Sequence, residues 1–75
     1  MKQTLIDLVK AIVDQPEEVS VNAKESGDTV ILELTVAKRD MGRVIGKEGK
    51  IAKSIRTVMR AAGARENKRI IVDIL

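Results

Sequence analysis

The chain has 75 residues, of which 44% are hydrophobic and 33% charged, and its formal net charge at neutral pH is +3. This balance is typical of one small folded domain, and no apolar run approaches the roughly 20 residues of a membrane span. Cysteine, histidine and all three aromatic residues are absent, which excludes disulfides, the commonest general base and metal ligand, and an aromatic platform for stacked bases. We therefore expect one cytoplasmic domain over residues 1–75, with no cofactor, no metal site and no membrane contact.

Charge is distributed unevenly along the chain. Residues 1–37 carry three basic and seven acidic side chains, whereas residues 38–69 carry eleven basic and three acidic ones. Such segregation is typical of proteins that bind a polyanion, although a basic face can also serve solvation alone.

The first element is predicted to be a helix over Thr4–Val13, because its apolar side chains recur at helical spacing. Thr4 and Asp7 resemble a weak capping box at its start, although the helix could also begin a turn earlier, and Pro16 is expected to end it. Its apolar stripe requires a surface to cover, so we interpret this helix as structural.

A β-hairpin is predicted next. Val19, Val21 and Ala23 alternate with polar residues, a turn signal follows at residues 26–28, and the alternation resumes over Thr29–Ala37. The pattern places Val30, Leu32, Leu34 and Val36 on one face and Ile31, Glu33 and Thr35 on the other. Glu33 has no second carboxylate or histidine near it in the pattern and is interpreted as a solvated strand residue.

Two helices and a strand complete the chain. A short helix over Met41–Ile45 is expected to follow Asp40 as its N-cap, and a longer one covers Lys50–Ala62, with Gly63 expected to end it. The longer helix has one apolar side and one basic side, and Arg69–Leu75 forms a last β-branched strand.

These elements predict an α+β fold in the order α-β-β-α-α-β, with a three-stranded mixed sheet and helices on one face. The path from the second strand to the third passes through two helices, which is long enough to make those strands parallel neighbours.

The segment between the two helices, Gly46-Lys47-Glu48-Gly49, is the strongest functional signal. A glycine pair permits a tight turn, and the first N–H groups of the following helix are free to bind a phosphate. The spacing fits neither a Walker A loop nor a dinucleotide-binding fingerprint. The alternative interpretation is a simple helix–helix turn in which small residues allow close packing.

Ile45-Gly46-Lys47-Glu48-Gly49, set between two helices in this order of elements, resembles the I-G-x-x-G signature of the KH domain. The N-terminal helix and hairpin resemble the type II, bacterial form, and residues 43–57 are most similar to small bacterial proteins that consist of a single KH domain. Two positions depart from the usual pattern. Ala52 narrows the expected groove, and Glu48 adds a negative charge to the turn.

The resemblance implies a non-enzymatic protein that binds single-stranded RNA, holding about four nucleotides with the glycine turn against their backbone. Bases are then expected in an aliphatic groove between the helices and the last strand. Backbone contact is expected from Gly46, Lys47, Glu48, Gly49 and Lys50, the groove floor from Val44, Ile45, Ala52, Ile55 and Ile71, and a cationic rim from Arg43, Lys53 and Arg56. For Ile45 and Ile55, ordinary core packing is the alternative.

A second hypothesis is a protein-interaction module that forms a homodimer, or a heterodimer with another KH protein. Ile31, Ile71 and Leu75 fall on the less buried face of the sheet, and Met59 is expected at a helix edge. A helix-turn-helix DNA binder would explain the basic helix but neither the glycine pair nor the hairpin. The chain offers no nucleophile–base pair, so an enzyme is the least supported hypothesis.

Overall fold

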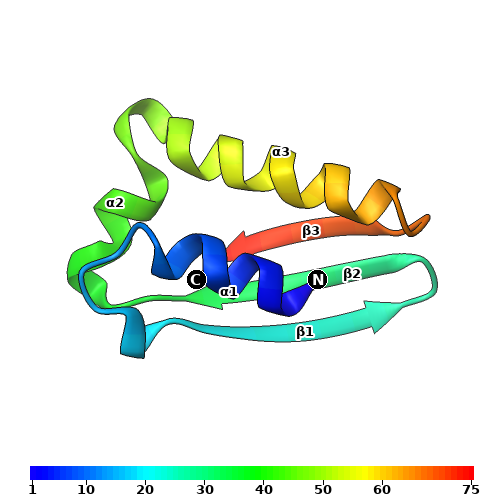
Figure 1. Cartoon of the computed structure of the whole chain (residues 1–75), viewed down its shortest axis with the longest axis horizontal. Coiled ribbons are helices and arrows are strands. Elements are labelled where there is room, and N and C mark those ends of the chain that lie inside the picture. The colour runs from blue at the N-terminus through cyan, green and yellow to red at the C-terminus, as the bar shows by residue number, and fades with distance from the viewer.

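Three β-strands form one mixed sheet in the order β1-β2-β3 (Figure 1). The strands are β1 (Ser20–Ser26), β2 (Thr29–Thr35) and β3 (Arg69–Ile74) in the computed structural model, which describes all 75 residues. β1 pairs with β2 in antiparallel orientation, and β2 pairs with β3 in parallel orientation. The predicted hairpin and the predicted parallel crossover are both confirmed.

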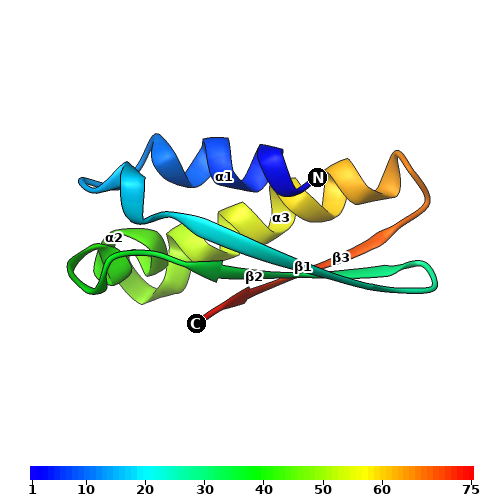
Figure 2. The ribbon, with the colours of Figure 1, turned by 90° about the horizontal axis from the view of Figure 1, so that it is seen from below.

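The helices are α1 (Lys2–Lys10), α2 (Met41–Ile45) and α3 (Lys50–Ala64), and three single turns of 3-10 helix lie at Pro16–Glu18, Lys38–Asp40 and Lys47–Gly49. The order is therefore α-β-β-α-α-β, as the sequence predicts. Figure 2 shows α1 and α3 on the same side of the sheet. None of these helices combines the length and the apolar character needed to cross a membrane.

The core lies between the sheet and α1 and α3. Alternation in β2 turns Val30, Leu32 and Leu34 toward the helices, and Leu32 and Leu34 are completely buried. The helices, the other strands and the residue that follows Thr35 supply the remaining core side chains: Leu5, Val9, Val21, Val36, Val44, Ile55, Met59, Ile70 and Val72. Aliphatic residues and one methionine thus fill a core that contains no aromatic ring.

The N-terminal helix differs from its prediction at both ends. It begins at Lys2 with Met1 as N-cap and no side-chain cap, and Asp7 accepts a hydrogen bond from Nε2 of Gln3 at 2.9 Å instead of closing a capping box. It ends at Lys10, well before Pro16, which opens a 3-10 turn of its own. Pro16 therefore marks the start of a new turn, and the helix has already ended several residues before it.

Gly63 does not end α3. It lies inside the helix and is buried, and a Cβ built on it would lie 2.7 Å from the carbonyl oxygen of Lys68. The left-handed residue after the helix is Asn67, with φ of 56°. Gly63 is therefore a packing residue that lets the chain return closely from α3 to β3.

The glycine turn between α2 and α3 lies at the opposite end of the molecule from the β1–β2 hairpin (Figure 1). From there α3 runs back along β3, so the turn, α3 and β3 follow one another on the same side of the molecule (Figure 1). This arrangement decides which residues can meet a common ligand.

Candidate nucleic-acid interface

The glycine turn has an unusual backbone. Gly46 has φ of 75° and ψ of 175°, and Glu48 and Gly49 both adopt left-handed conformations, with φ of 57° and 74°. A Cβ at Gly46 would lie 2.8 Å from the Cβ of Ile51 and 3.0 Å from its backbone nitrogen. Glycine is therefore required at residue 46 by both conformation and space, whereas at residue 49 conformation alone requires it.

The turn leads directly into the N-terminus of α3. Gly49 is the N-cap and has no side chain to bond the free amides, and no acidic residue lies in the first turn of the helix. The positive end of the helix dipole is therefore not neutralised from within α3. A left-handed residue followed by a right-handed one, here Gly49 and Lys50, also orients consecutive N–H groups into a concavity that suits an anion.

Cations follow the turn along the exposed side of α3. The exposed side chains are those of Lys47, Lys50, Lys53, Arg56 and Arg60. Three ion pairs occur in the structure, Lys24–Glu33, Arg43–Asp14 and Lys68–Glu25, and none involves these five residues. The positive charge on this side of α3 is available to a partner.

A groove of about 360 Å³ lies between α3 and β3. It is lined by Arg56, Arg60, Arg69, Ile70, Ile71 and Val72. Three guanidinium groups thus surround a short aliphatic floor, and Nε of Arg56 donates a hydrogen bond of 3.2 Å to the carbonyl oxygen of Val72. The groove joins cationic groups to an apolar surface, and of the predicted floor and rim residues only Ile71 and Arg56 line it.

The edge of β3 adds main-chain groups to the same groove. The N–H groups of Arg69 and Leu75 donate to the carbonyl oxygens of Asp28 and Leu34. The main-chain N–H and C=O groups of the odd-numbered residues of β3 therefore point toward β2. Alternation then directs the N–H and C=O groups of Ile70 and Val72 away from β2 and toward the groove. Such groups can pair with the edges of bases.

The predicted site residues divide into exposed and buried sets. Lys47, Glu48, Lys50, Lys53 and Arg56 are exposed, Gly46 and Gly49 are partly exposed, and Ile45 and Ile71 retain 41% and 40% exposure. Val44, Ala52 and Ile55 are buried to between 0% and 4% exposure and offer no surface to a ligand. For Ile55 the core interpretation is therefore correct, whereas Ile45 lies at the surface beside the turn.

Two contacts next to the turn were not predicted. Arg43, assigned to the cationic rim, pairs with Asp14 at 3.2 Å. Asp40 was expected to cap α2 but makes no capping bond, and its buried carboxylate instead accepts the backbone N–H groups of Asp14 and Gln15 at 3.1 and 3.0 Å. Asp40 is therefore the N-cap residue of α2, as predicted, but its side chain does not cap the helix because a distant segment competes for its oxygens.

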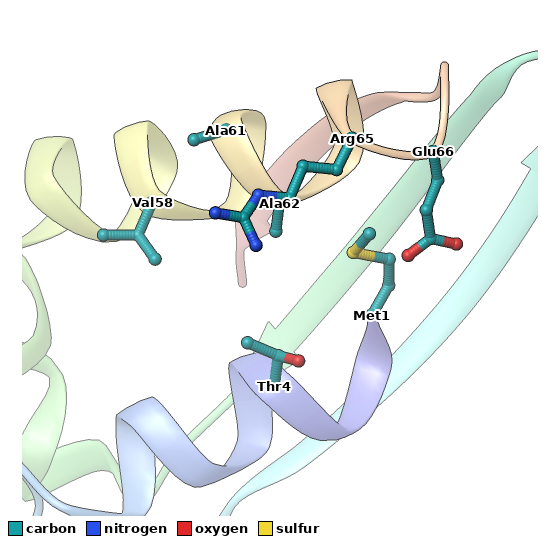
Figure 3. A pocket seen from close by; sticks show the side chains of 7 residues that line it. All are labelled: Met1, Thr4, Val58, Ala61, Ala62, Arg65 and Glu66. Atoms are coloured by element: carbon teal, nitrogen blue, oxygen red, sulfur yellow. The ribbon is translucent and has the colours of Figure 1, made fainter.

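Outside this side of the molecule, a second hollow of about 410 Å³ lies between α1 and α3 (Figure 3). Met1, the N-cap of α1, and Thr4 face Val58, Ala61 and Ala62 of α3 across it, and Arg65 and Glu66 lie at its rim (Figure 3). One cation and one carboxylate largely cancel there, so the hollow lacks the positive charge of the α3–β3 groove. It is the weaker candidate for a polyanion.

Glu33 lies on the open face of the sheet. Its carboxylate accepts a hydrogen bond of 3.0 Å from Nδ2 of Asn22 and pairs with Nζ of Lys24 at 3.3 Å. These two contacts, Asn22 first, hold the pKa of Glu33 below its ordinary value. No group of three or more His, Cys, Asp or Glu side chains that could hold a metal ion occurs in the structure. The Glu33 cluster is an ordinary surface network.

Comparison with known proteins agrees with this geometry. The family described as "KhpA/KhpB, KH domain" matches residues 2–74 of the chain. The chain belongs to this KH-domain family. The KH domain is 53% identical to the RNA-binding protein KhpA of Clostridium acetobutylicum over the full length of both chains. It is 47% identical to KhpA of Caldanaerobacter subterraneus, again over both full lengths, and 43% identical to KhpA of Listeria monocytogenes over all of this chain and 99% of that protein. No solved structure matches the chain.

Sequence reasoning missed part of the groove of this KH domain. Arg60 lies one helical turn after Arg56 on the basic side that the sequence predicted for this helix, but it was not assigned to the rim. Arg69, Ile70 and Val72 could not have been assigned, because their contribution depends on β3 being the edge strand beside α3.

Proposed function

We propose that this KH domain, with residues 1–75 acting as one unit, is a non-enzymatic cytoplasmic protein that binds single-stranded RNA. The observation that carries the proposal is the Gly46–Gly49 turn, whose left-handed residues open onto the free amides of α3 beside unpaired cations. The relatives described above are named RNA-binding proteins, which supports the same ligand class. No cofactor or metal takes part.

The RNA backbone is held by the turn. A phosphate accepts hydrogen bonds from the amides at Gly49 and Lys50, and Lys47 and Lys50 neutralise the neighbouring phosphates. The carboxylate of Glu48 repels the phosphate, so the phosphate contact depends mainly on the backbone N–H groups and on Lys47. About four nucleotides fit such a module.

The bases lie along the α3–β3 groove. Ile45 and Ile71 present exposed aliphatic surface, Val44, Ala52 and Ile55 support it from the core beneath, and Arg43, Lys53 and Arg56 form the rim. Main-chain groups of Ile70 and Val72 pair with base edges, and Arg60 and Arg69 extend the cationic wall beyond the predicted set. Aliphatic packing and edge pairing replace the aromatic stacking that this chain cannot provide.

The test is fluorescence anisotropy of a short single-stranded RNA, with duplex RNA and single-stranded DNA as competitors. With about four phosphates engaged, the slope of log affinity against log salt should be about −3. The double variant Lys47→Asp, Glu48→Asp should lose binding while its circular dichroism spectrum and unfolding midpoint stay close to wild type. Aspartate tolerates the left-handed conformation, so the turn itself should survive.

The matched control is Lys2→Asp, Glu17→Asp, which makes the same change in net charge on exposed residues remote from the turn. Its affinity should remain within about twofold of wild type, since exposed charges beyond a Debye length are largely screened. Equal losses in the two double variants would show that net charge, not the turn, governs binding. Binding that survives in both double variants would move the contact to the exposed side of α3.

A second candidate function, pairing with a second copy or with another KH protein, is supported by the open face of the sheet. Register places Ile31 beside Ile71 on this face, with Glu33 beside Asp73 on one side and Thr29 beside Arg69 on the other. A two-fold axis across the Ile31–Ile71 row would set Asp73 of one copy opposite Arg69 of the other. Such a face is self-complementary, as an isologous dimer requires.

Sedimentation velocity tests this candidate. Ile31→Lys should convert a dimer to a monomer without affecting the groove, because Ile31 does not line it. A wild-type chain that is monomeric at all concentrations, alone and with a second KH protein, excludes pairing. A dimer that does not bind RNA makes pairing the principal function.

A further inference from the structure

We propose that Asp40 is a positioning residue of the RNA-binding turn, acting through the loop that follows α1. The inference rests on the proposed function for its RNA readout, but its structural part can be tested without RNA. Asp40 places a buried carboxylate at the start of α2, the helix that leads into the turn.

Asp40 is the one charged residue in the buried set, with 1% exposure. Burying a carboxylate is costly unless its oxygens are hydrogen-bonded. Here each oxygen has its own partner, because Oδ1 accepts the N–H of Asp14 and Oδ2 accepts the N–H of Gln15. No buried side-chain oxygen or nitrogen in the structure lacks a partner. The carboxylate thus joins two segments about 25 residues apart in the sequence.

The segment that Asp40 fixes is α2. This helix has five residues, and an isolated helix of that length is not stable on its own. Its orientation must come from tertiary contacts, namely the fully buried Val44, the Asp40 carboxylate and the ion pair between Arg43 and Asp14. Two of these three contacts reach the same loop residue, Asp14.

The orientation of α2 in turn sets the position of the RNA-binding turn. The N–H of Gly46 donates to the carbonyl oxygen of Gly42 at 2.8 Å, so the first glycine of the turn is hydrogen-bonded to the helix that Asp40 anchors. If the anchor is lost, α2 can tilt about Val44, and the turn moves relative to the first amides of α3. A binding site of this kind loses affinity when its groups shift by a fraction of an ångström.

Amide hydrogen exchange of the free protein tests the structural step. In Asp40→Asn one of the two acceptor oxygens is lost, and in Asp40→Ala both are lost, so the effect should be graded. The amide of Gly46 should exchange roughly fivefold faster in Asp40→Asn, and faster again in Asp40→Ala, while core amides such as that of Leu32 change less. A uniform increase at Gly46 and Leu32 alike would mean that Asp40 serves global stability alone, and would overturn the proposal.

Anisotropy with the single-stranded RNA tests the functional step, under conditions where each variant is fully folded. Removing a negative charge favours RNA binding by itself, so a loss of affinity in Asp40→Asn cannot be electrostatic. We expect a loss of roughly fivefold, by the size of typical couplings through a positioning contact. Glu18→Gln is the control, since it removes the same charge from an exposed residue whose side chain is in none of the hydrogen bonds or ion pairs described above.

Unchanged affinity in Asp40→Asn, or an equal change in Glu18→Gln, overturns the positioning role, as does an Asp40→Asn chain that does not fold. If the wild-type chain does not bind RNA at all, the proposed function fails, and the exchange of the Gly46 amide still decides whether Asp40 holds the turn.

Discussion

The side chain of Ile51 fills the space that a Cβ at Gly46 would occupy. The two residues lie on opposite sides of the turn, and a built Cβ at Gly46 would lie 2.8 Å from the Cβ of Ile51. The first glycine of the motif is therefore required for the close packing of the turn against α3, whatever it binds. This separates it from the second glycine, around which the structure leaves open space.

Glycine-to-alanine substitutions should separate these effects. Gly46→Ala combines a φ of 75° with the clash against Ile51 and should destabilise the fold by about 2–4 kcal/mol. Gly49→Ala should destabilise the fold only through the left-handed conformation that alanine would have to adopt, by about 1–2 kcal/mol. Gly42→Ala, in an open helical position, should stabilise by up to about 1 kcal/mol. Urea unfolding of the three variants checks this order, and equal costs at residues 46 and 49 would contradict the role of Ile51.

Glu48 carries two disadvantages, a left-handed backbone and a negative charge in the turn. Glu48→Asn removes the charge and places a residue that tolerates this conformation, so it should raise both RNA affinity and stability, the latter by roughly 0.5 kcal/mol. Glu48→Gln is the matched variant, which removes the charge and keeps the strain. Glu48→Gln should raise RNA affinity without raising stability. A stability gain equal to that of Glu48→Asn would show that relief of backbone strain is not the cause of the gain in stability.

The α3–β3 groove predicts which arginines take part in binding. Arg60→Ala and Arg69→Ala should each weaken RNA binding and reduce the magnitude of the salt slope by about 0.7, because each removes one phosphate contact on a single strand. Arg65→Ala, at the rim of the hollow between α1 and α3, should leave the slope unchanged. A change in slope for Arg65 equal to that for Arg60 would show that binding follows total charge and not the groove.

Gly63 gives a prediction on stability alone. Its added Cβ would lie 2.7 Å from the carbonyl oxygen of Lys68, so Gly63→Ala should cost about 2–3 kcal/mol despite the better helix propensity of alanine. Thermal unfolding beside the exposed helical control Ser54→Ala measures this. A neutral or stabilising result would contradict the close approach of the chain after α3.

Glu33 gives a pH-dependent prediction. Its hydrogen bond from Asn22 and its pair with Lys24 lower its pKa in the folded state. The folded chain therefore binds this proton more weakly than the unfolded chain, so the stabilisation is present above the ordinary glutamate pKa and is lost as the pH falls through the lowered one. Glu33→Gln should unfold at lower urea concentration than wild type at neutral pH, and the difference should disappear in acid. A difference that persists in acid would assign the effect to packing.

The sequence alone determined the order and type of the elements. Alternation with period two separates Leu32 and Leu34 from Ile31 and Glu33, and the structure confirms that separation, because neighbouring side chains of a strand must point to opposite faces. The charge distribution and the glycine pair likewise identified residues 43–56 as the candidate interface. These features depend on local backbone geometry, which is set by residues that are near one another in the sequence.

The tertiary structure decided everything that depends on distant neighbours. Met59, expected at a helix edge, is completely buried, and Gly63, expected to end α3, is enclosed by the returning chain. Asp40 bonds the backbone at residues 14 and 15 instead of its own helix, and β3 becomes one wall of the groove because it is the edge strand beside α3. In each case the local sequence pattern predicts one role for a residue, and a segment that is distant in the sequence gives that residue another role in the folded chain. Periodicity cannot indicate such a partner, because its position is set by how the helices pack across the sheet.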